Sequence, residues 1–302
     1  MTELAASGKK FYIDLVGIDQ AHQWRRDEGR YKRNLADVFG LEMVRADPKE
    51  LYQAYQEADE SEAKKIADKW IEGATKVTQP YDAILNSAKL YLAMKKLLKK
   101  YDADAITVDC GTLLLTGWLP AIPCFPFIQL WNDGSTGVCE SDMDSTVSAL
   151  LGRYLAGRPG FTSNHSFDLK NNRITYLHCM PCPNLYGSGS PAQNYEIVPH
   201  GESHVFGPSI WVDFPVGEPV TTIKASMLEK KIAIGSGKIV GSIKDEQACS
   251  SKMVVETNAR KILQNYDYPT FGWHRVSFLG DLRETFIAAA KLLGLEVVEE
   301  DK

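Results

Sequence analysis

The chain has 302 residues, of which 44% are hydrophobic and 24% charged, as is typical of a globular protein large enough for two domains. These proportions exclude a disordered chain, a collagen-like repeat and a coiled coil. The net charge of −5 and the lack of a basic face argue against nucleic-acid binding, so a small molecule is the better expectation for a ligand.

Strands and helices alternate through the first half of the sequence. Short apolar runs bounded by turn formers predict strands at residues 11–17, 41–46, 105–108 and 125–128. Apolar residues at three- and four-residue intervals predict helices at residues 24–39, 47–55, 61–76, 82–100 and 146–155. Asp47-Pro48 supplies an N-cap and a first-turn proline, and Gly40 and Gly157 are placed as helix ends. This alternation predicts a doubly wound parallel sheet.

The second half is richer in β-branched residues. Strands are expected at residues 173–177, 204–212, 220–224, 231–234, 238–243 and 252–256. Near the end, residues 273–279 predict a strand and residues 281–293 a helix capped by Asp281, which we expect to pack back on the sheet. We therefore predict an α/β protein with a doubly wound domain at residues 1–165, followed by a mainly antiparallel β-barrel-like domain at residues 166–302.

The cysteines and the N-terminus indicate a cellular compartment. Six cysteines are scattered through the chain without disulfide-scaffold spacing, which favours reduced thiols. The first residues lack the basic and long apolar segments of a secretion signal, and no window reaches the length of a membrane span. We expect a cytoplasmic protein with no membrane partner.

Three familiar motifs fail on spacing or context. The glycine-rich run at residues 235–241 misses the dinucleotide spacing and lies among β runs, so it predicts a hairpin. His200-Gly201-Glu202 resembles half of a zinc deaminase signature, but the Cys-x-x-Cys at residues 179–182 precedes it. That Cys-x-x-Cys could be a redox pair or half of a zinc knuckle, yet no second pair exists to complete a knuckle.

Glu140, His178 and His274 are the strongest candidates for chemistry. Glu140 opens a helix just after a strand, where α/β folds place ligand-contacting groups, whereas Asp142 and Asp144 could simply favour the helix macrodipole. Each histidine borders an apolar run and alone could be structural. Together the three side chains form a donor set that suits Mn²⁺ or another divalent cation, with open positions for two oxygens of a sugar or polyol.

The order of several short motifs resembles the L-fucose/L-arabinose isomerase-like family. The motifs are, in chain order, Cys139-Glu140-Ser141-Asp142, Gly157-Arg158-Pro159, His178-Cys179, Pro199-His200-Gly201-Glu202, residues 215–221 and Trp273-His274. The likeness covers residues 101–299. Residues 11–100 resemble the middle α/β domain of that family, and its first α/β domain has no counterpart here, so we expect a truncated or compact relative.

The resemblance implies a metal-dependent aldose–ketose isomerase, an intramolecular oxidoreductase that moves a proton through an enediol of a sugar substrate. Glu140 would be base and metal ligand, His178 and His274 would complete the metal site, and a homo-oligomer is expected. The second family carboxylate corresponds to Asn164, counted here as a catalytic and metal-binding position. An amide can ligate but cannot act as a base, so His165 or Asp168 are alternatives for proton transfer. A lyase or hydrolase of the same fold and a non-catalytic sugar-binding protein are the alternative functions.

Overall fold

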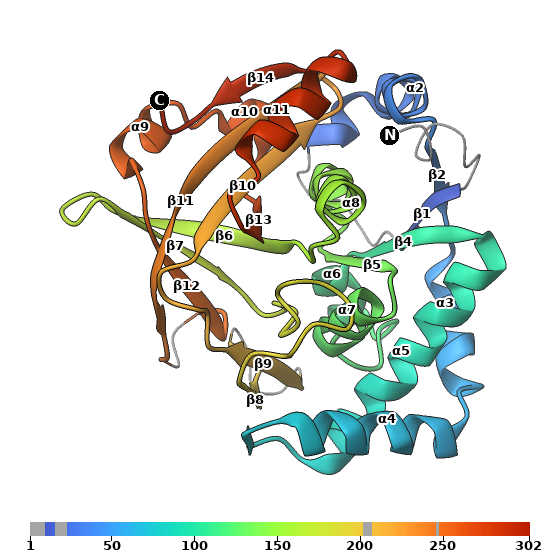
Figure 1. The fold of residues 1–302 in the computed structure, drawn as a ribbon. Coiled ribbons are helices and arrows are strands. Elements are labelled where there is room, and N and C mark those ends of the chain that lie inside the picture. Colours follow the sequence, from blue (N-terminus) through green and yellow to red (C-terminus); the bar gives the residue numbers. More distant parts are fainter. Residues whose placement is uncertain (1–9, 16–22, 202–206, 246–247) are drawn as a thin grey trace.

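A parallel four-stranded sheet forms the N-terminal part of the protein. The computed structural model describes residues 10–15, 23–201, 207–245 and 248–302 (Figure 1). The sheet has the order β2-β1-β4-β5, and its strands are β1 (Lys10–Leu15), β2 (Glu42–Arg45), β4 (Ala103–Val108) and β5 (Thr136–Cys139). Helices connect these strands: η1 (Gln23–Asp27), α2 (Glu28–Phe39), α3 (Pro48–Gln56), α4 (Glu60–Gly73), α5 (Tyr81–Tyr101), α6 (Cys110–Leu115) and α7 (Cys124–Asn132). Helix α8 (Met143–Ala156) follows β5 and leads to the C-terminal part.

Local capping chemistry sets the predicted helix ends. The Asp47 carboxylate accepts a hydrogen bond from the Lys49 amide, and Pro48 occupies the first turn of α3. Helices α2 and α8 both end at glycines in the left-handed conformation, Gly40 and Gly157, with φ of 66° and 63°. These boundaries agree with the sequence because each depends on residues within one turn.

The strand predicted at residues 125–128 is wrong, because these residues lie in α7. This helix is apolar on nearly all sides, and most of its residues are buried. A short apolar run does not distinguish a fully buried helix from a buried strand. The strand that precedes α8 is β5, which begins at Thr136 and packs so closely on α7 that a Cβ at Gly137 would overlap Phe127.

Six antiparallel strands form a closed cycle of pairings in the C-terminal part. In order around the cycle they are β10 (Pro219–Ser226), β13 (Arg275–Leu279), β6 (Phe161–Asp168), β7 (Arg173–His178), β12 (Ser251–Glu256) and β11 (Lys231–Ile243). Pairing of β11 with β10 closes the cycle. Strand β14 (Glu296–Glu299) adds in parallel to β11, so the terminus does pack back on the sheet.

Smaller elements complete the fold. A separate three-stranded sheet contains β3 (Lys76–Val77), β8 (Tyr195–Pro199) and β9 (Pro208–Val212). Three helices follow in the C-terminal part: α9 (Ala259–Gln264), α10 (Tyr268–Phe271) and α11 (Arg283–Leu292). In the described parts of the chain, no helix has the length and apolar character needed to cross a membrane.

Several β predictions need correction. Residues 235–241 are not a hairpin, and the two strands predicted at 231–234 and 238–243 are one, because all of these residues lie within β11. Strands β6 and β8 were not predicted, since their alternation of polar and apolar residues is weak. Helix α11 begins at Arg283, so Asp281 is not its cap. Residues 16–17 and 204–206 of predicted strands, and Glu202, lie outside the described residues.

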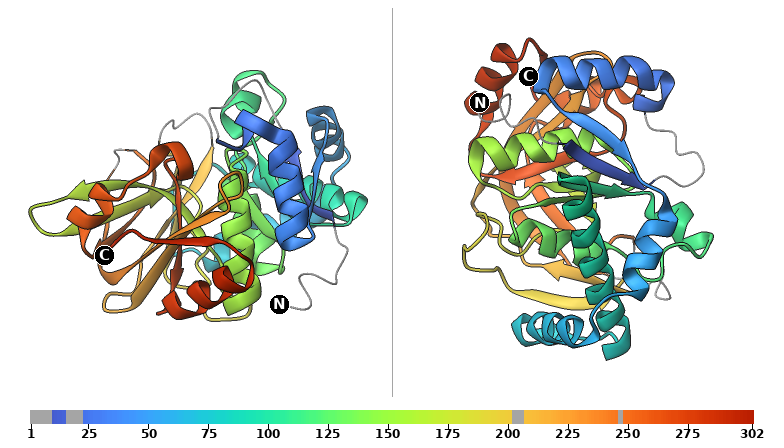
Figure 2. Two further views of the ribbon diagram at one scale, coloured as in Figure 1. Left: turned by 90° about the horizontal axis from the view of Figure 1, so that it is seen from above. Right: turned by 90° about the vertical axis from the view of Figure 1, so that its right-hand side faces the viewer.

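Helix α8 joins the two parts of the molecule. It contacts β4 and β5 on one side and β10 and β13 on the other, and Figure 1 shows it between the two sheets. The contact with β13 is close, because a Cβ on Gly152 would overlap the Phe278 ring. The left view of Figure 2 shows the C-terminal strands on one side of the molecule and the N-terminal helices on the other. The start of α8 therefore lies where both parts can contribute side chains.

Candidate metal centre

A tight turn between β5 and α8 presents Glu140. Glu140 and Ser141 both adopt positive φ, 63° and 52°, a region that residues other than glycine rarely occupy. The Ser141 amide donates to the Val108 carbonyl at 3.1 Å, which ties the turn to the neighbouring strand β4. Two consecutive left-handed residues cost of order 1 kcal/mol each, and such strain persists where the surrounding structure enforces it. The turn thus holds the Glu140 carboxylate, 28% exposed, in a fixed place.

Two imidazoles from the strand cycle converge on that carboxylate. His178 ends β7 and His274 immediately precedes β13. The Nε2 atom of His178 lies 3.4 Å from Oε1 of Glu140, and the Nε2 atom of His274 lies 3.6 Å from Oε2. The two rings are 5.5 Å apart between centroids, and both side chains are buried. Glu140 therefore stands between two nitrogen donors.

Asp142 orients His274 from behind. The Nδ1–H group of His274 donates to Oδ2 of Asp142 at 2.8 Å, which directs Nε2 toward Glu140. The same Oδ2 accepts from Lys224 Nζ at 2.6 Å and from Ser145 Oγ at 2.8 Å, while Oδ1 caps α8 through the Ser145 amide at 2.9 Å. Lys224 and Asp142 are almost fully buried, with side chains 2% and 5% exposed. The carboxylate thus serves as helix cap, ion-pair partner and histidine anchor.

The two histidines titrate differently. Burial lowers the pKa of His178, but the hydrogen bond and charge of Glu140 outweigh burial and raise that pKa to about 9. Burial lowers the pKa of His274 more than Glu140 and Asp142 raise it. Without a metal, therefore, His178 is protonated near neutral pH and His274 is neutral.

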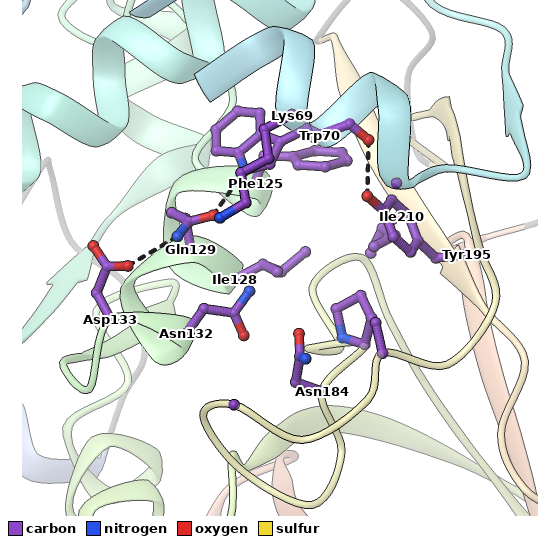
Figure 3. Close-up of a pocket in the computed structure, with 14 residues that line it drawn as sticks. Lys69, Trp70, Phe125, Ile128, Gln129, Asn132, Asp133, Asn184, Tyr195 and Ile210 are labelled. Carbon is purple, nitrogen blue, oxygen red and sulfur yellow. Dashed lines mark hydrogen bonds between the residues drawn. The ribbon is translucent and has the colours of Figure 1, made fainter. Parts of the chain in front are cut away.

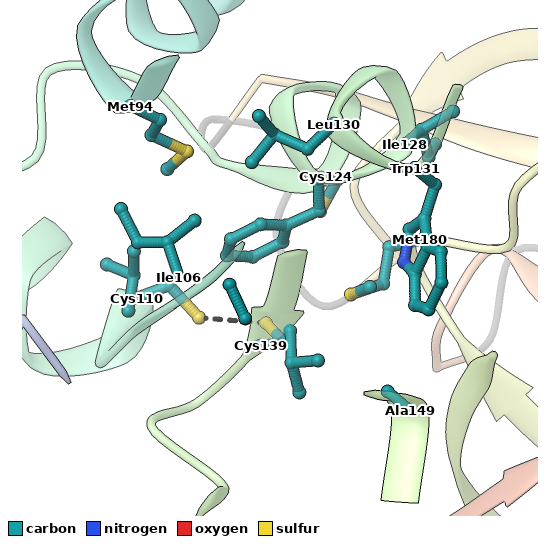
Figure 4. Close-up of a cluster of buried hydrophobic side chains, with 14 of the residues drawn as sticks. Met94, Ile106, Cys110, Cys124, Ile128, Leu130, Trp131, Cys139, Ala149 and Met180 are labelled. Carbon is teal, nitrogen blue, oxygen red and sulfur yellow. Dashed lines mark hydrogen bonds between the residues drawn. The ribbon is translucent and has the colours of Figure 1, made fainter. Parts of the chain in front are cut away.

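A thiol is also close to Glu140. Cys139, Glu140 and His178 offer donor atoms within 4.8 Å of one another, a group that could hold a metal ion. The Sγ atom of Cys139 lies 3.1 Å from Sγ of Cys110, and Figure 4 shows the two thiols facing each other within the apolar core. Burial and the neighbouring Cys110 raise the pKa of Cys139 well above its usual value, with the Cys110 hydrogen bond as the largest contribution. All six cysteines are buried, and none forms a disulfide.

Asn164, the fourth predicted site residue, lies on a strand next to the one that follows His274. Asn164 lies in β6, and because Ser163 pairs with Arg275, Asn164 comes level with His274. Among the described residues, its side chain makes no hydrogen bond or ion pair with Glu140, His178 or His274.

The two alternative bases do not belong to this donor set. His165 is surrounded by aromatic rings, and burial lowers its pKa to about 3. Asp168 bonds to Asn171 at the turn after β6. The structure therefore brings together Glu140, His178 and His274.

Sequence reasoning missed the partners behind the site. The sequence predicts no role for Lys224, and for Asp142 it predicts only a carboxylate at the start of a helix. A lysine between Ile223 and Ala225 of a buried strand is the one local signal for Lys224, because a buried ammonium needs a carboxylate partner. Nothing local indicates that Asp142 is that partner.

Other cavities lie away from these residues. One of about 410 Å³ is bounded by α4, α7 and β8 (Figure 3), and another of about 390 Å³ is lined by His200 and Trp211. Neither is lined by Glu140, His178 or His274. The candidate metal centre is thus defined by its donor atoms.

Comparison with known proteins points to sugar isomerases at low identity. No protein-family profile matches the chain. Over 273 residues, 87% of the chain, it is 23% identical to the sulfoquinovose isomerase of Clostridium sp. (strain MSTE9) and covers 59% of that protein. It is also 23% identical over 219 residues, 71% of the chain, to sulfoquinovose isomerases of Priestia aryabhattai and Priestia megaterium, covering 48% of each. The chain therefore spans about half the length of the curated relatives it matches, and the similarity supports a relationship at the level of the L-fucose isomerase-like superfamily.

Proposed function

We propose that this protein is a metal-dependent sugar isomerase-like enzyme that interconverts an aldose and a ketose, acting on a sugar or sugar derivative. The observation that carries the proposal is the Glu140 carboxylate flanked by the Nε2 atoms of His178 and His274. The low-identity similarity to proteins named sulfoquinovose isomerase supports the same class of substrate and reaction.

The residues present fit a divalent cation. The Nε2 atom of His274 is buried and has no hydrogen-bond partner, while its Nδ1 is already anchored, as is usual for a metal-ligating histidine. Glu140, His178 and His274 would hold the ion, and we propose Asn164, level with His274, as a further oxygen donor. A carboxylate and imidazoles suit Mn²⁺ or a similar borderline cation. When bound, the cation would supply Lewis-acid stabilisation of negative charge on the sugar oxygens.

The proton transfer falls to Glu140. In an aldose–ketose interconversion, a base removes the proton from C2 while O1 gains a proton, which gives the enediol; the base then protonates C1 while O2 loses its proton. The proton held by the base exchanges with solvent between the two steps. The Glu140 carboxylate is partly exposed at a fixed turn, so it can reach a bound substrate without reorganising the backbone. Burial keeps His274 neutral, and the Asp142 acceptor holds its proton on Nδ1, so that Nε2 faces Glu140 in one orientation.

The proposal also includes two domains and a homo-oligomer. We assign the parallel sheet to a doubly wound domain and the cycle of six strands to a β-barrel-like domain, with the division near residues 165 and 166, inside β6. We also propose a homo-oligomer, in which a neighbouring copy would cover the open side of Glu140. The two domains follow from the order of strands and helices, and the homo-oligomer follows from the family resemblance.

Solvent exchange tests the reaction directly. The protein is loaded with Mn²⁺ in deuterated water and incubated with sulfoquinovose and with unsubstituted aldohexoses, and deuterium incorporation is followed by NMR. We expect exchange at the carbon next to the carbonyl and its loss, by a factor of at least a hundred, in Glu140→Gln. Glu72→Gln, on the exposed face of α4, is the matched control and should exchange normally.

The same experiment separates the alternatives. A sugar that raises the melting temperature but exchanges no deuterium would indicate a non-catalytic binding protein. The specific argument for this alternative is that Asn164 stands where the family has a carboxylate. A change of carbon skeleton or a released fragment would indicate a lyase or hydrolase. If calorimetry detects no binding of any divalent metal, the metal-dependent proposal is refuted.

A further inference from the structure

A small cavity at the C-terminal ends of α7 and α8 contains only cationic and neutral side chains. Its volume is about 180 Å³, and residues of the segment 182–188 form part of its wall. Arg153 and Arg158 line it together with Trp131, Asn132 and Asn184, and no Asp or Glu side chain does. Glu140, His178 and His274 do not line it either, so this cavity is separate from the candidate metal centre.

Two hydrogen-bond donors at this cavity are buried without a partner. These are the Nη1 atom of Arg158 and the Nε1 atom of Trp131, whose side chain is only 5% exposed. More than nine in ten buried polar groups in proteins are hydrogen-bonded, so two unmet donors beside one cavity call for an acceptor. Such an acceptor would have to come from a ligand or from solvent.

The amide of Asn132 adds donors of the same kind. The side-chain Oδ1 of Asn132 accepts a hydrogen bond from the Cys182 thiol at 3.3 Å, and the main-chain carbonyl of Asn132 accepts one from Ser188 Oγ at 2.6 Å. Because the side-chain oxygen is engaged, the Asn132 NH₂ group remains to donate. A Cβ on Gly187 would overlap the Gly157 carbonyl, so this part of the cavity wall packs directly on the end of α8.

Neither arginine is neutralised by a carboxylate in the part of the chain that is described. The Arg158 guanidinium stacks on the Tyr186 ring at 4.9 Å, and Arg153 stacks on Tyr154 at 5.2 Å. Glu218 and Asp104 interact with these two tyrosines, but neither carboxylate lines the cavity.

Helix capping alone does not account for both arginines. Arg153 bonds to the Asp104 carbonyl and to Thr136 Oγ1 at 3.3 and 3.4 Å, and it lies in the last turn of α8, where a cation complements the helix dipole. Arg158 follows the helix, and its buried Nη1 reaches no carbonyl. Its guanidinium is therefore available to an anion.

We propose that this cavity binds a compact oxyanion group, such as a sulfate, sulfonate or phosphate, through Arg158, Trp131 Nε1 and Asn132. The guanidinium of Arg158, the indole N–H of Trp131 and the NH₂ group of Asn132 are all hydrogen-bond donors, and the oxygens of an oxyanion are all acceptors. The cavity shares Asn132 and Asn184 with the cavity of about 410 Å³ shown in Figure 3, so the oxyanion can be free or attached to a larger sugar. This inference does not depend on the isomerase reaction.

Calorimetry with sulfate tests the site. The full chain is titrated with sodium sulfate, with sodium chloride at equal ionic strength as reference. We expect sulfate to bind, and its dissociation constant to rise at least tenfold in Arg158→Met and several-fold in Trp131→Phe, which keeps an aromatic ring but loses the N–H. Arg260→Met, the same change on the exposed face of α9, should bind as the wild type does. Equal melting temperatures of the variants would exclude misfolding as the cause.

A second titration separates the two sources of the oxyanion. A hexose 6-phosphate that binds more tightly than sulfate, and loses that advantage in Arg158→Met, would indicate a sugar-borne group, whereas equal affinities for both would indicate a free-anion site. The unmodified hexose should gain nothing from Arg158. The proposal is overturned if sulfate and the hexose phosphate fail to bind, or if they bind with the same affinity to wild type and Arg158→Met.

Discussion

Replacing Asp142 by Asn separates the three tasks of this carboxylate. Asparagine caps helices as well as aspartate does, so the bond to the Ser145 amide should survive. At the Oδ2 position, however, an NH₂ group would replace the acceptor shared by Lys224 and His274. An amide N–H facing Nδ1 favours the other imidazole tautomer, which places a proton on Nε2 and blocks the lone pair that faces Glu140.

The cost in stability follows from the burial of Lys224. Removing one partner of a buried ion pair costs about 3–5 kcal/mol because a charge is left uncompensated. Lys224 keeps its bond to Ser145 Oγ at 2.6 Å and lies in the field of Asp144, so we expect the lower end, about 3 kcal/mol. Burial already lowers the pKa of Lys224, and losing Asp142 lowers it further. The unfolded chain then binds more protons than the folded one, so the stability of Asp142→Asn rises with pH up to the ordinary lysine pKa of 10.5.

A double variant distinguishes stability from histidine positioning. Asp142→Asn with Lys224→Met contains no uncompensated ammonium, so urea unfolding should recover to within about 1 kcal/mol of the wild type. Mn²⁺ affinity measured by calorimetry should nevertheless stay 10- to 100-fold weaker, roughly the effect of losing an outer partner of a ligating histidine. Wild-type affinity in the double variant would refute the view that Asp142 positions His274.

Three further predictions concern pH and packing. Burial raises the pKa of Asp144 from 3.8 to about 7, so the folded state binds the extra proton and loses stability as pH rises between these values. The unfolding free energy of Asp144→Asn relative to wild type should therefore increase over this range and level off above it, whereas a constant difference would contradict the assignment. Gly152→Ala should lower the free energy of unfolding in urea by about 1–3 kcal/mol because the added methyl group overlaps the Phe278 ring. Gly29→Ala on α2 is the control and should not lower it. Equal effects of the two substitutions would argue against close packing of α8 on β13. Burial lowers the pKa of His178, but Glu140 raises it to about 9, and a bound metal must displace that proton. Mn²⁺ affinity measured by calorimetry should therefore rise with pH up to about 9. A flat profile would show that His178 is not a ligand.

Features that depend on near neighbours in the chain could be read from the sequence. The Asp47 cap with Pro48, the glycine ends of α2 and α8, and the alternation of strands and helices are properties of a few successive residues. The choice of Glu140 also belongs here, because a carboxylate directly after a strand and before a helix is a local pattern. Its left-handed backbone was not predicted, since no glycine marks the turn.

Tertiary packing decided the rest, because the deciding contacts join residues far apart in the chain. The apolar run of α7 is enclosed on nearly all sides, and its residues alone do not distinguish helix from strand. Residues 235–241 are strand because β10 and β12 pair with β11 along its length. Residue type and motif order could nominate His178 and His274 as ligands, but only the closed cycle of strands brings both to within 3.6 Å of Glu140. A lysine in a buried strand calls for a carboxylate, but nothing in the sequence identifies Asp142 as that carboxylate, because the two residues meet at a junction that exists only in the folded protein.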